Sequence, residues 1–273
     1  MVSRSLASQM LGSVRATAIF TCLLLLSPTG PAMAKNASAQ REIAVAAAMA
    51  EVASASRSQS ARAVPRRLFD GELAETHPSR FGPLPEADRI VMIDEVQAVA
   101  RVPAHGEWPD LYFFLDRGAD GSWRATALRA LALPPFIRMI HDALRPQESE
   151  GDEAFMLANV ELAMRPDRAL REWFFNHRAR LDNIIVLAQA SEPGTSAERP
   201  LSAPGVVAQL RALHLLGGSV HPDGTLRIVI GGVQDDSVGM LHVPDRRAPP
   251  PMSRHDLIWI EPLAGGWFLY RTT

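Results

Sequence analysis

The residues best suited to chemistry are two carboxylates and two imidazoles in the last forty residues. Asp235 and Asp236 end an apolar run, and His242 and His255 flank the proline-rich segment VPDRRAPPPMSRHD. Together such groups can hold a divalent metal ion or exchange protons as acid and base. Their spacing matches no standard ligand motif, so they predict a metal-assisted or acid-base hydrolase only as an alternative reading.

The common local signatures of catalysis are missing. The chain has no G-x-S-x-G, H-E-x-x-H, Walker or G-x-G-x-x-G motif. Its glycine-rich words, GADGSW and GGVQDDSVG, do not open helices and so lack the amide nest of a phosphate loop. The pair Asp94 and Glu95 is typical of a solvated strand end. We therefore expect no cofactor and no metal ion.

Aromatic residues suggest a different kind of site. Tyr112 and Phe113 lie in one predicted strand, and Trp259 and Tyr270 lie in two others. Neighbouring residues of a strand face opposite sides, so adjacent aromatics place a ring on each face of a sheet. Rings on a solvent face would bind a sugar, a peptide or another protein, but packing of all of them in the core is the preferred interpretation, because two small sheets and a helical layer need large residues to fill them.

Residues 1–34 have the composition of a cleavable export signal. Arg4 and Arg15 lie before an apolar run from Ala16 to Leu26, and the sequence AMA at residues 32–34 ends the segment. The run is shorter than the roughly 20 residues that a membrane-spanning helix needs. We expect a bacterial periplasmic or secreted protein that has no transmembrane anchor after cleavage.

Cysteine content and charge exclude several classes of function. The single cysteine, Cys22, lies in the predicted signal, so the mature chain lacks disulfides and thiolate chemistry. The net charge of −2 falls to −4 once Arg4 and Arg15 are removed. No basic surface for nucleic acid is expected, and an envelope protein or a cell-wall polymer is the predicted partner.

The mature chain is expected to begin with a tether. Residues 35–68 are rich in alanine, serine and arginine and contain no aromatic residue. Alanine favours a helix from Gln40 to Ala55, but an alanine face buries little apolar area. We expect a flexible or weakly helical linker, with binding to an anionic surface as the alternative.

Two strand-rich segments flank a helical one. Residues 69–133 and 206–273 alternate apolar and polar positions around glycine turns, which predicts antiparallel β-meanders. Residues 134–190 predict helices, most clearly where apolar residues recur every three or four positions from Leu170 to Ala188. Residues 191–205 read as a loop, and Val206 to Leu216 is ambiguous between helix and strand.

The two strand-rich segments share a series of words in the same order. RIVMIDEVQ, starting at Arg89, corresponds to RIVIGGVQ, starting at Arg227. A Val-Pro pair, an Asp-Leu pair and a Gly-x-Trp ending at Trp123 and Trp267 follow in both. A duplication explains this order, and the alternative is that similar hairpin sequences arose independently.

These patterns predict an α+β protein: two related antiparallel β-meander modules flanking a helical insert, either as one pseudo-symmetric sheet or as two small barrels. The preferred function is a non-catalytic envelope binding or scaffold protein.

Export should leave a mature product that begins at Lys35, because signal cleavage follows the small-x-small word at residues 32–34. N-terminal sequencing of the exported protein checks this start. A membrane-bound product that retains residues 1–34 would contradict it.

Overall fold

A computed structural model describes residues 31–57, 68–76, 81–103, 110–130, 141–142, 150–191, 197–233, 236–244 and 247–273. The chain divides into two units, residues 1–38 and 39–273. The signal segment up to residue 30 lies outside the described residues, as does most of the helix expected from Phe136 to Leu144. The architecture below is that of the second unit, into which the first helix extends.

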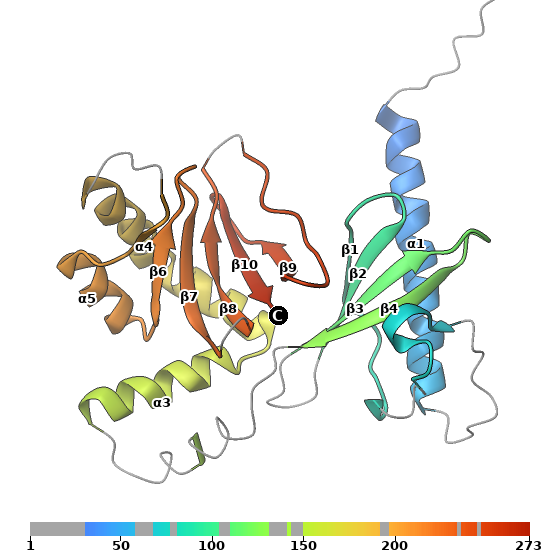
Figure 1. Ribbon diagram of the computed structural model, residues 1–273, viewed down its shortest axis with the longest axis horizontal. Helices are drawn as coiled ribbons and strands as arrows, with labels where there is room; N and C mark the ends of the chain where they lie inside the picture. Colours follow the sequence, from blue (N-terminus) through green and yellow to red (C-terminus); the bar gives the residue numbers. More distant parts are fainter. Residues whose placement is uncertain are drawn as a thin grey trace, which may run out of the picture. The chain divides into compact units, whose positions relative to one another are not determined.

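The first sheet is a four-stranded antiparallel meander with the order β1-β2-β3-β4 (Figure 1). Its strands are β1 (Arg89–Met92), β2 (Gln97–Val102), β3 (Leu111–Arg117) and β4 (Trp123–Ala130). Short turns join β1 to β2 and β3 to β4, as the alternating sequence of this segment predicts. A 3₁₀ turn, η2 (Gly71–Leu73), precedes the sheet.

One face of this sheet is covered by a long helix, α1 (Pro31–Arg57). Val45, Met49 and Val52 are almost completely buried among the side chains of β2, β3 and β4. The expectation of a weakly anchored tether is therefore wrong for this part of the chain. A narrow apolar stripe suffices because the small residues Ala98 and Ala100 let the helix approach the strands closely.

The second sheet has six antiparallel strands in the order β5-β6-β7-β8-β10-β9 (Figure 1). They are β5 (Arg199–Pro200), β6 (Gly217–Val220), β7 (Leu226–Val233), β8 (Asp236–His242), β9 (Leu257–Pro262) and β10 (Trp267–Thr272). Within the described ranges the two sheets are separate and open, so the protein is α+β with two antiparallel sheets and neither one continuous sheet nor closed barrels.

Three helices accompany the second sheet: α3 (Gly151–Ala163), α4 (Asp167–Ser191) and α5 (Pro204–Ala212). All three pack on one sheet face, where Leu170, Phe174 and Leu181 of α4 are fully buried. The predicted helical periodicity of α4 is confirmed. The ambiguous segment from Val206 to Leu216 is mostly helix, with Val206 and Leu210 turned into the same core.

The sequence motifs shared by the two segments lie on equivalent hairpins, but these hairpins pair differently with the rest of their sheets. Trp123 and Trp267 each begin the second strand of a hairpin, and both pack on the helix-covered face of their sheet. In the first sheet β2 pairs with β3, but in the second β8 pairs with β10, and β9 lies at the edge. The second sheet therefore follows the meander order from β5 to β8 and departs from it only in the β9–β10 hairpin, so the agreement between the two segments does not extend to the full strand order.

The shared motif has an acidic pair in the first segment and two glycines in the second, and this difference has a structural reason. Asp94 lies in the β1–β2 turn, where its carboxylate accepts the backbone N–H groups of Val96 and Gln97, each at 2.7 Å. Gly231 instead lies against α3, and a Cβ atom there would meet the Cβ of Ala163 at 2.6 Å. Only glycine permits this close approach of helix and strand.

A buried ion-pair network joins the two sheets. Asp167, at the start of α4, has no exposed surface and accepts from the Arg271 Nε at 2.7 Å and from the Tyr112 hydroxyl at 2.7 Å. Arg101 of β2 lies 3.3 Å from Asp167 and donates to Glu261 of β9 at 2.7 Å. Burial raises the pKa of Tyr112 well above its usual range, so its hydroxyl stays protonated and donates.

Two further arginines and two further carboxylates extend this network. Glu261 also accepts from Arg89 at 2.6 Å and from Arg171 at 3.1 Å. Asp88 takes two hydrogen bonds from Arg101 at 2.9 Å, and Asp110 accepts the backbone N–H of Asp167 at 3.0 Å. Four arginines thus face four carboxylates, which offsets part of the cost of burying these charges, although Arg271 Nη1 is buried without a hydrogen-bond partner among the described residues.

Replacing Asp167 by asparagine should destabilise the fold by about 3–5 kcal/mol, because it leaves the buried guanidinium of Arg271 without its charged partner. Urea unfolding followed by tryptophan fluorescence measures this loss. The matched control is Arg168→Ala at the next position, whose side chain is 88% exposed and should change stability by no more than about 0.5 kcal/mol. Equal effects of the two substitutions would contradict a central role for the network.

Candidate functional site

The structure does not bring the four candidate hydrolytic residues together. Asp236 begins β8 and His242 ends it, so their Cα atoms are roughly 20 Å apart at the usual rise of a strand. His255 is exposed in the turn before β9, and Asp235 lies outside the described residues. In the described part of the chain, no group of three or more His, Cys, Asp or Glu residues is placed to hold a metal ion.

The four aromatic candidates do not form an exposed face. Tyr112, Phe113, Trp259 and Tyr270 are at most 1% exposed, which agrees with the preferred interpretation of core packing and not with an open aromatic surface. Phe113 packs under α1, and Tyr112 lies 5.2 Å from Trp259 where the first sheet meets β9. Each is taken into a core because both faces of the first sheet and the inner part of β9 are covered. Tyr270 alone borders a surface hollow.

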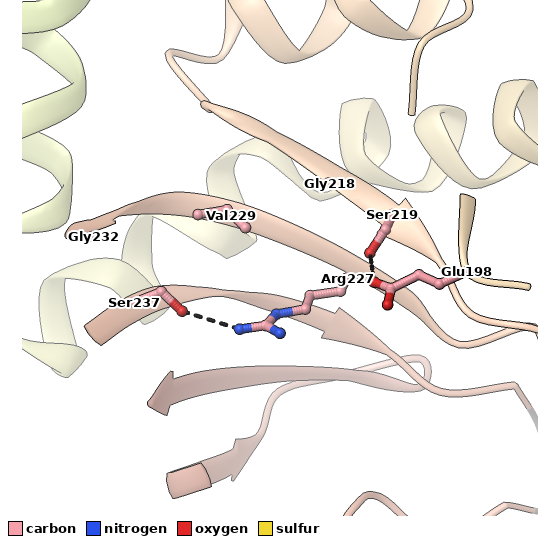
Figure 2. A pocket seen from close by; sticks show the side chains of 7 residues that line it. All are labelled: Glu198, Gly218, Ser219, Arg227, Val229, Gly232 and Ser237. Carbon is pink, nitrogen blue, oxygen red and sulfur yellow. Dashed lines mark hydrogen bonds between the residues drawn. The ribbon is translucent and has the colours of Figure 1, made fainter. Parts of the chain in front are cut away.

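That hollow belongs to an open groove on the face of the second sheet opposite its helices. One part, of about 380 Å³, is lined by residues of β6, β7 and β8, and the other, of about 240 Å³, continues towards the loop before β9. The parts share Glu198, Ser219 and Arg227, so they form one surface, which we call the β6–β8 groove. Figure 2 shows the first part with Arg227 extended along its floor.

Alternation along β7 explains why a charged side chain lies in the groove. Leu226, Ile228 and Ile230 point into the core beneath the helices. Arg227 and Val229 therefore point to the opposite face and line the groove. The local fold thus exposes one arginine in the middle of an otherwise apolar strand.

The guanidinium of Arg227 is held by neutral groups. Its Nη2 donates to Ser237 Oγ at 3.1 Å (Figure 2). Its Nε donates to the Tyr270 hydroxyl at 3.0 Å. Its carbon lies 4.9 Å from the centre of the Tyr270 ring. Burial raises the pKa of Tyr270, so this partner is an uncharged phenol. Among the described residues, Arg227 makes no ion pair with a carboxylate.

Ser237 is itself fixed by a second hydroxyl residue. Its backbone N–H donates to Thr272 Oγ1 at 2.8 Å, and the two hydroxyl oxygens are also 2.8 Å apart. Ser237 and Thr272 are both buried. The orientation of Arg227 is therefore set by groups that are already immobilised, which is the condition for a preorganised binding group.

Acidic residues border the same groove. Glu198 accepts a hydrogen bond from the Ser219 hydroxyl beside Arg227 (Figure 2). Asp223 lies 3.1 Å from His221 Nδ1 in the tight turn between β6 and β7. The Thr225 backbone N–H, then its hydroxyl and His221, lower the pKa of Asp223 to about 2. Asp223 therefore stays ionised near neutral pH and does not exchange protons there.

The groove presents charged and hydrogen-bonding groups to solvent. It offers a fixed cation, the three carboxylates of Glu198, Asp223 and Asp256, the His221 imidazole and several hydroxyl groups. Of the groups that line it, Tyr270 is protonated and Asp223 is ionised at neutral pH, so neither has a pKa suited to acid-base work. The groove is thus suited to recognising a polar, charged ligand.

The sequence contains one weak signal for this site. An arginine between Leu226 and Ile228, in a strand whose other alternate residues are apolar, indicates a face that is not core. Ser219, Ser237 and Glu198 carry no comparable signal, because they come from three separate segments that the sheet pairing brings side by side.

Comparison with protein-family models, with curated proteins and with solved structures gave no match. No helix in the described ranges is long and apolar enough to cross a membrane.

The carboxyl group of Asp223 should titrate near pH 2 rather than near its ordinary value of 3.8. Because the folded turn favours the ionised form, the stability that Asp223 contributes is complete above about pH 4 and is lost as the pH falls through 2. Carbon-detected NMR of the side-chain carboxyl measures the midpoint. A midpoint near 3.8 would show that the Thr225 and His221 contacts do not form in solution.

Proposed function

We propose that this is an exported, non-catalytic binding protein of the bacterial envelope, and that it binds a protein or cell-wall ligand in the β6–β8 groove. The observation that carries the proposal is the preorganised guanidinium of Arg227 on an open sheet face. A cation that is held only by neutral partners retains its charge for a ligand.

The separation of the candidate hydrolytic residues that the structure describes supports binding over hydrolysis. Asp236 and His242 lie at opposite ends of one strand, and such a separation prevents them from sharing a substrate bond. The composition of residues 1–34 supports export, and a net charge of −4 after cleavage favours a ligand other than nucleic acid.

Blocking the groove should abolish ligand binding. Ser219 lies on β6 at the centre of the groove, and a tryptophan there would fill the space beside Arg227. We expect Ser219→Trp in the mature chain, residues 35–273, to lose at least tenfold in affinity for purified cell-wall sacculi or for captured envelope proteins. Co-sedimentation with sacculi and affinity capture from the periplasm measure the two kinds of ligand.

The matched control is Ser202→Trp, an exposed position before α5 that does not line the groove. It should bind as the unmodified chain does. Circular dichroism must show the same melting temperature for both variants. Equal binding by Ser219→Trp and the unmodified chain would refute the groove as the site, and no binding of either ligand by the unmodified chain would refute the function.

A further inference from the structure

The β6–β8 groove carries opposite charges at defined places, and this pattern restricts its ligand. Arg227 supplies one positive charge on the groove floor. Glu198 borders the same space, yet it hydrogen-bonds to Ser219 and forms no ion pair with Arg227. The two charges are therefore available separately to a ligand that carries both signs.

The free hydrogen-bonding capacity of Arg227 defines where a ligand anion would bind. Two of its three nitrogens are engaged, by Tyr270 and by Ser237. Its Nη1 makes no hydrogen bond with any described residue, and the side chain as a whole is exposed. Because the plane of the guanidinium is fixed on the Tyr270 ring, Nη1 and the remaining N–H of Nη2 present two donors in a set orientation.

The neighbouring carboxylates argue for a singly charged anion. Glu198, Asp223 and Asp256 line the part of the groove that extends past Arg227, and Asp223 is paired with Arg247 at 3.3 Å. A dianion such as phosphate would be repelled by Glu198 and Asp256, whereas a carboxylate carries half that charge. A cationic amino group on the same ligand would instead be attracted to Glu198.

We propose that the β6–β8 groove binds the free carboxyl end of a peptide, with the carboxylate on Arg227 and a cationic amino group of the ligand near Glu198. This inference rests on the proposed function and names the chemical class of its ligand. The hydroxyl groups of Ser219 and Thr225 line the same groove and can accept hydrogen bonds from peptide amides. Two sources provide this chemistry: stem peptides of the cell wall, which carry D-residues, and the C-termini of proteins, which carry L-residues.

Dipeptide probes test the proposal on the unmodified chain. D-alanyl-D-alanine and L-alanyl-L-alanine represent the two sources, and each is compared with its C-terminal amide, its N-acetyl form and inorganic phosphate. NMR shift changes at Arg227, Ser219 and Ser237 report binding. We expect millimolar binding of a free dipeptide, about tenfold or greater weakening by the amide, and weaker binding of phosphate. The preferred configuration identifies the source.

Variants test separately the contact of Arg227 with the ligand carboxylate and the contact of Glu198 with the ligand amino group. Arg227→Gln should remove the difference between free acid and amide, and Arg227→Lys should restore part of it because the charge remains without the planar fork. Glu198→Gln should remove only the difference between the free and the acetylated amino end. Arg168→Gln, on the exposed side of α4, is the matched control and should leave all affinities unchanged.

Equal binding of acid and amide, or no shift change with any dipeptide, would overturn the carboxylate inference. The binding of sacculi and of envelope proteins, measured with the same variants, distinguishes a failure of the carboxylate inference from a failure of the proposed function. If Ser219→Trp abolishes that binding and Arg227→Gln does not, the groove binds a ligand but not through a carboxylate on Arg227. If Ser219→Trp has no effect, the groove is not the binding site and both proposals fail.

Discussion

The contact between Asp167 and Arg271 is the interaction on which the arrangement of this protein depends. Both side chains are fully buried, and their charges are separated by 2.7 Å. Asp167 also begins α4, where a negative charge is favoured by the helix dipole. One carboxylate thus connects the start of α4, the strand β10 of the second sheet and, through Tyr112 and Arg101, the first sheet. Since such charges are tolerated in a core only when paired, separating these elements would leave a buried charge without its partner.

The same strand connects this network to the groove. In β10, Arg271 points to Asp167, whereas its neighbours Tyr270 and Thr272 both line the groove. Tyr270 holds Arg227, and Thr272 fixes Ser237. Alternation along β10 therefore connects the buried charge of Arg271 with the exposed charge of Arg227 in the groove. The groove is rigid because its floor is the outer face of a sheet whose inner face packs on three helices.

The matched words show the limit of local sequence information. The hairpins that contain Trp123 and Trp267 are alike in turn, strand and direction of packing, because these properties follow from glycine positions and from alternation within a few residues. Gly121 and Gly265 both have positive φ angles in those turns. Strand order follows instead from the length and course of the connection before the hairpin. The proline-rich segment from Val243 to Asp256 carries β9 past the place that β10 occupies.

What the sequence by itself determined is therefore local: the α+β class, the hairpins, and the apolar stripe of α4. Each of these depends on the periodicity of side chains along one element. The tertiary structure alone decided the packing of α1. Its apolar residues Val45, Met49 and Val52 form part of a core only because the facing strand β2 carries the small residues Ala98 and Ala100. It also decided the site. Asp236 and His242 are close in sequence and distant in space, whereas Glu198, Arg227 and Ser237 are distant in sequence and meet because β6, β7 and β8 pair. Hydrogen bonding between strands sets these distances, and a linear pattern does not encode them.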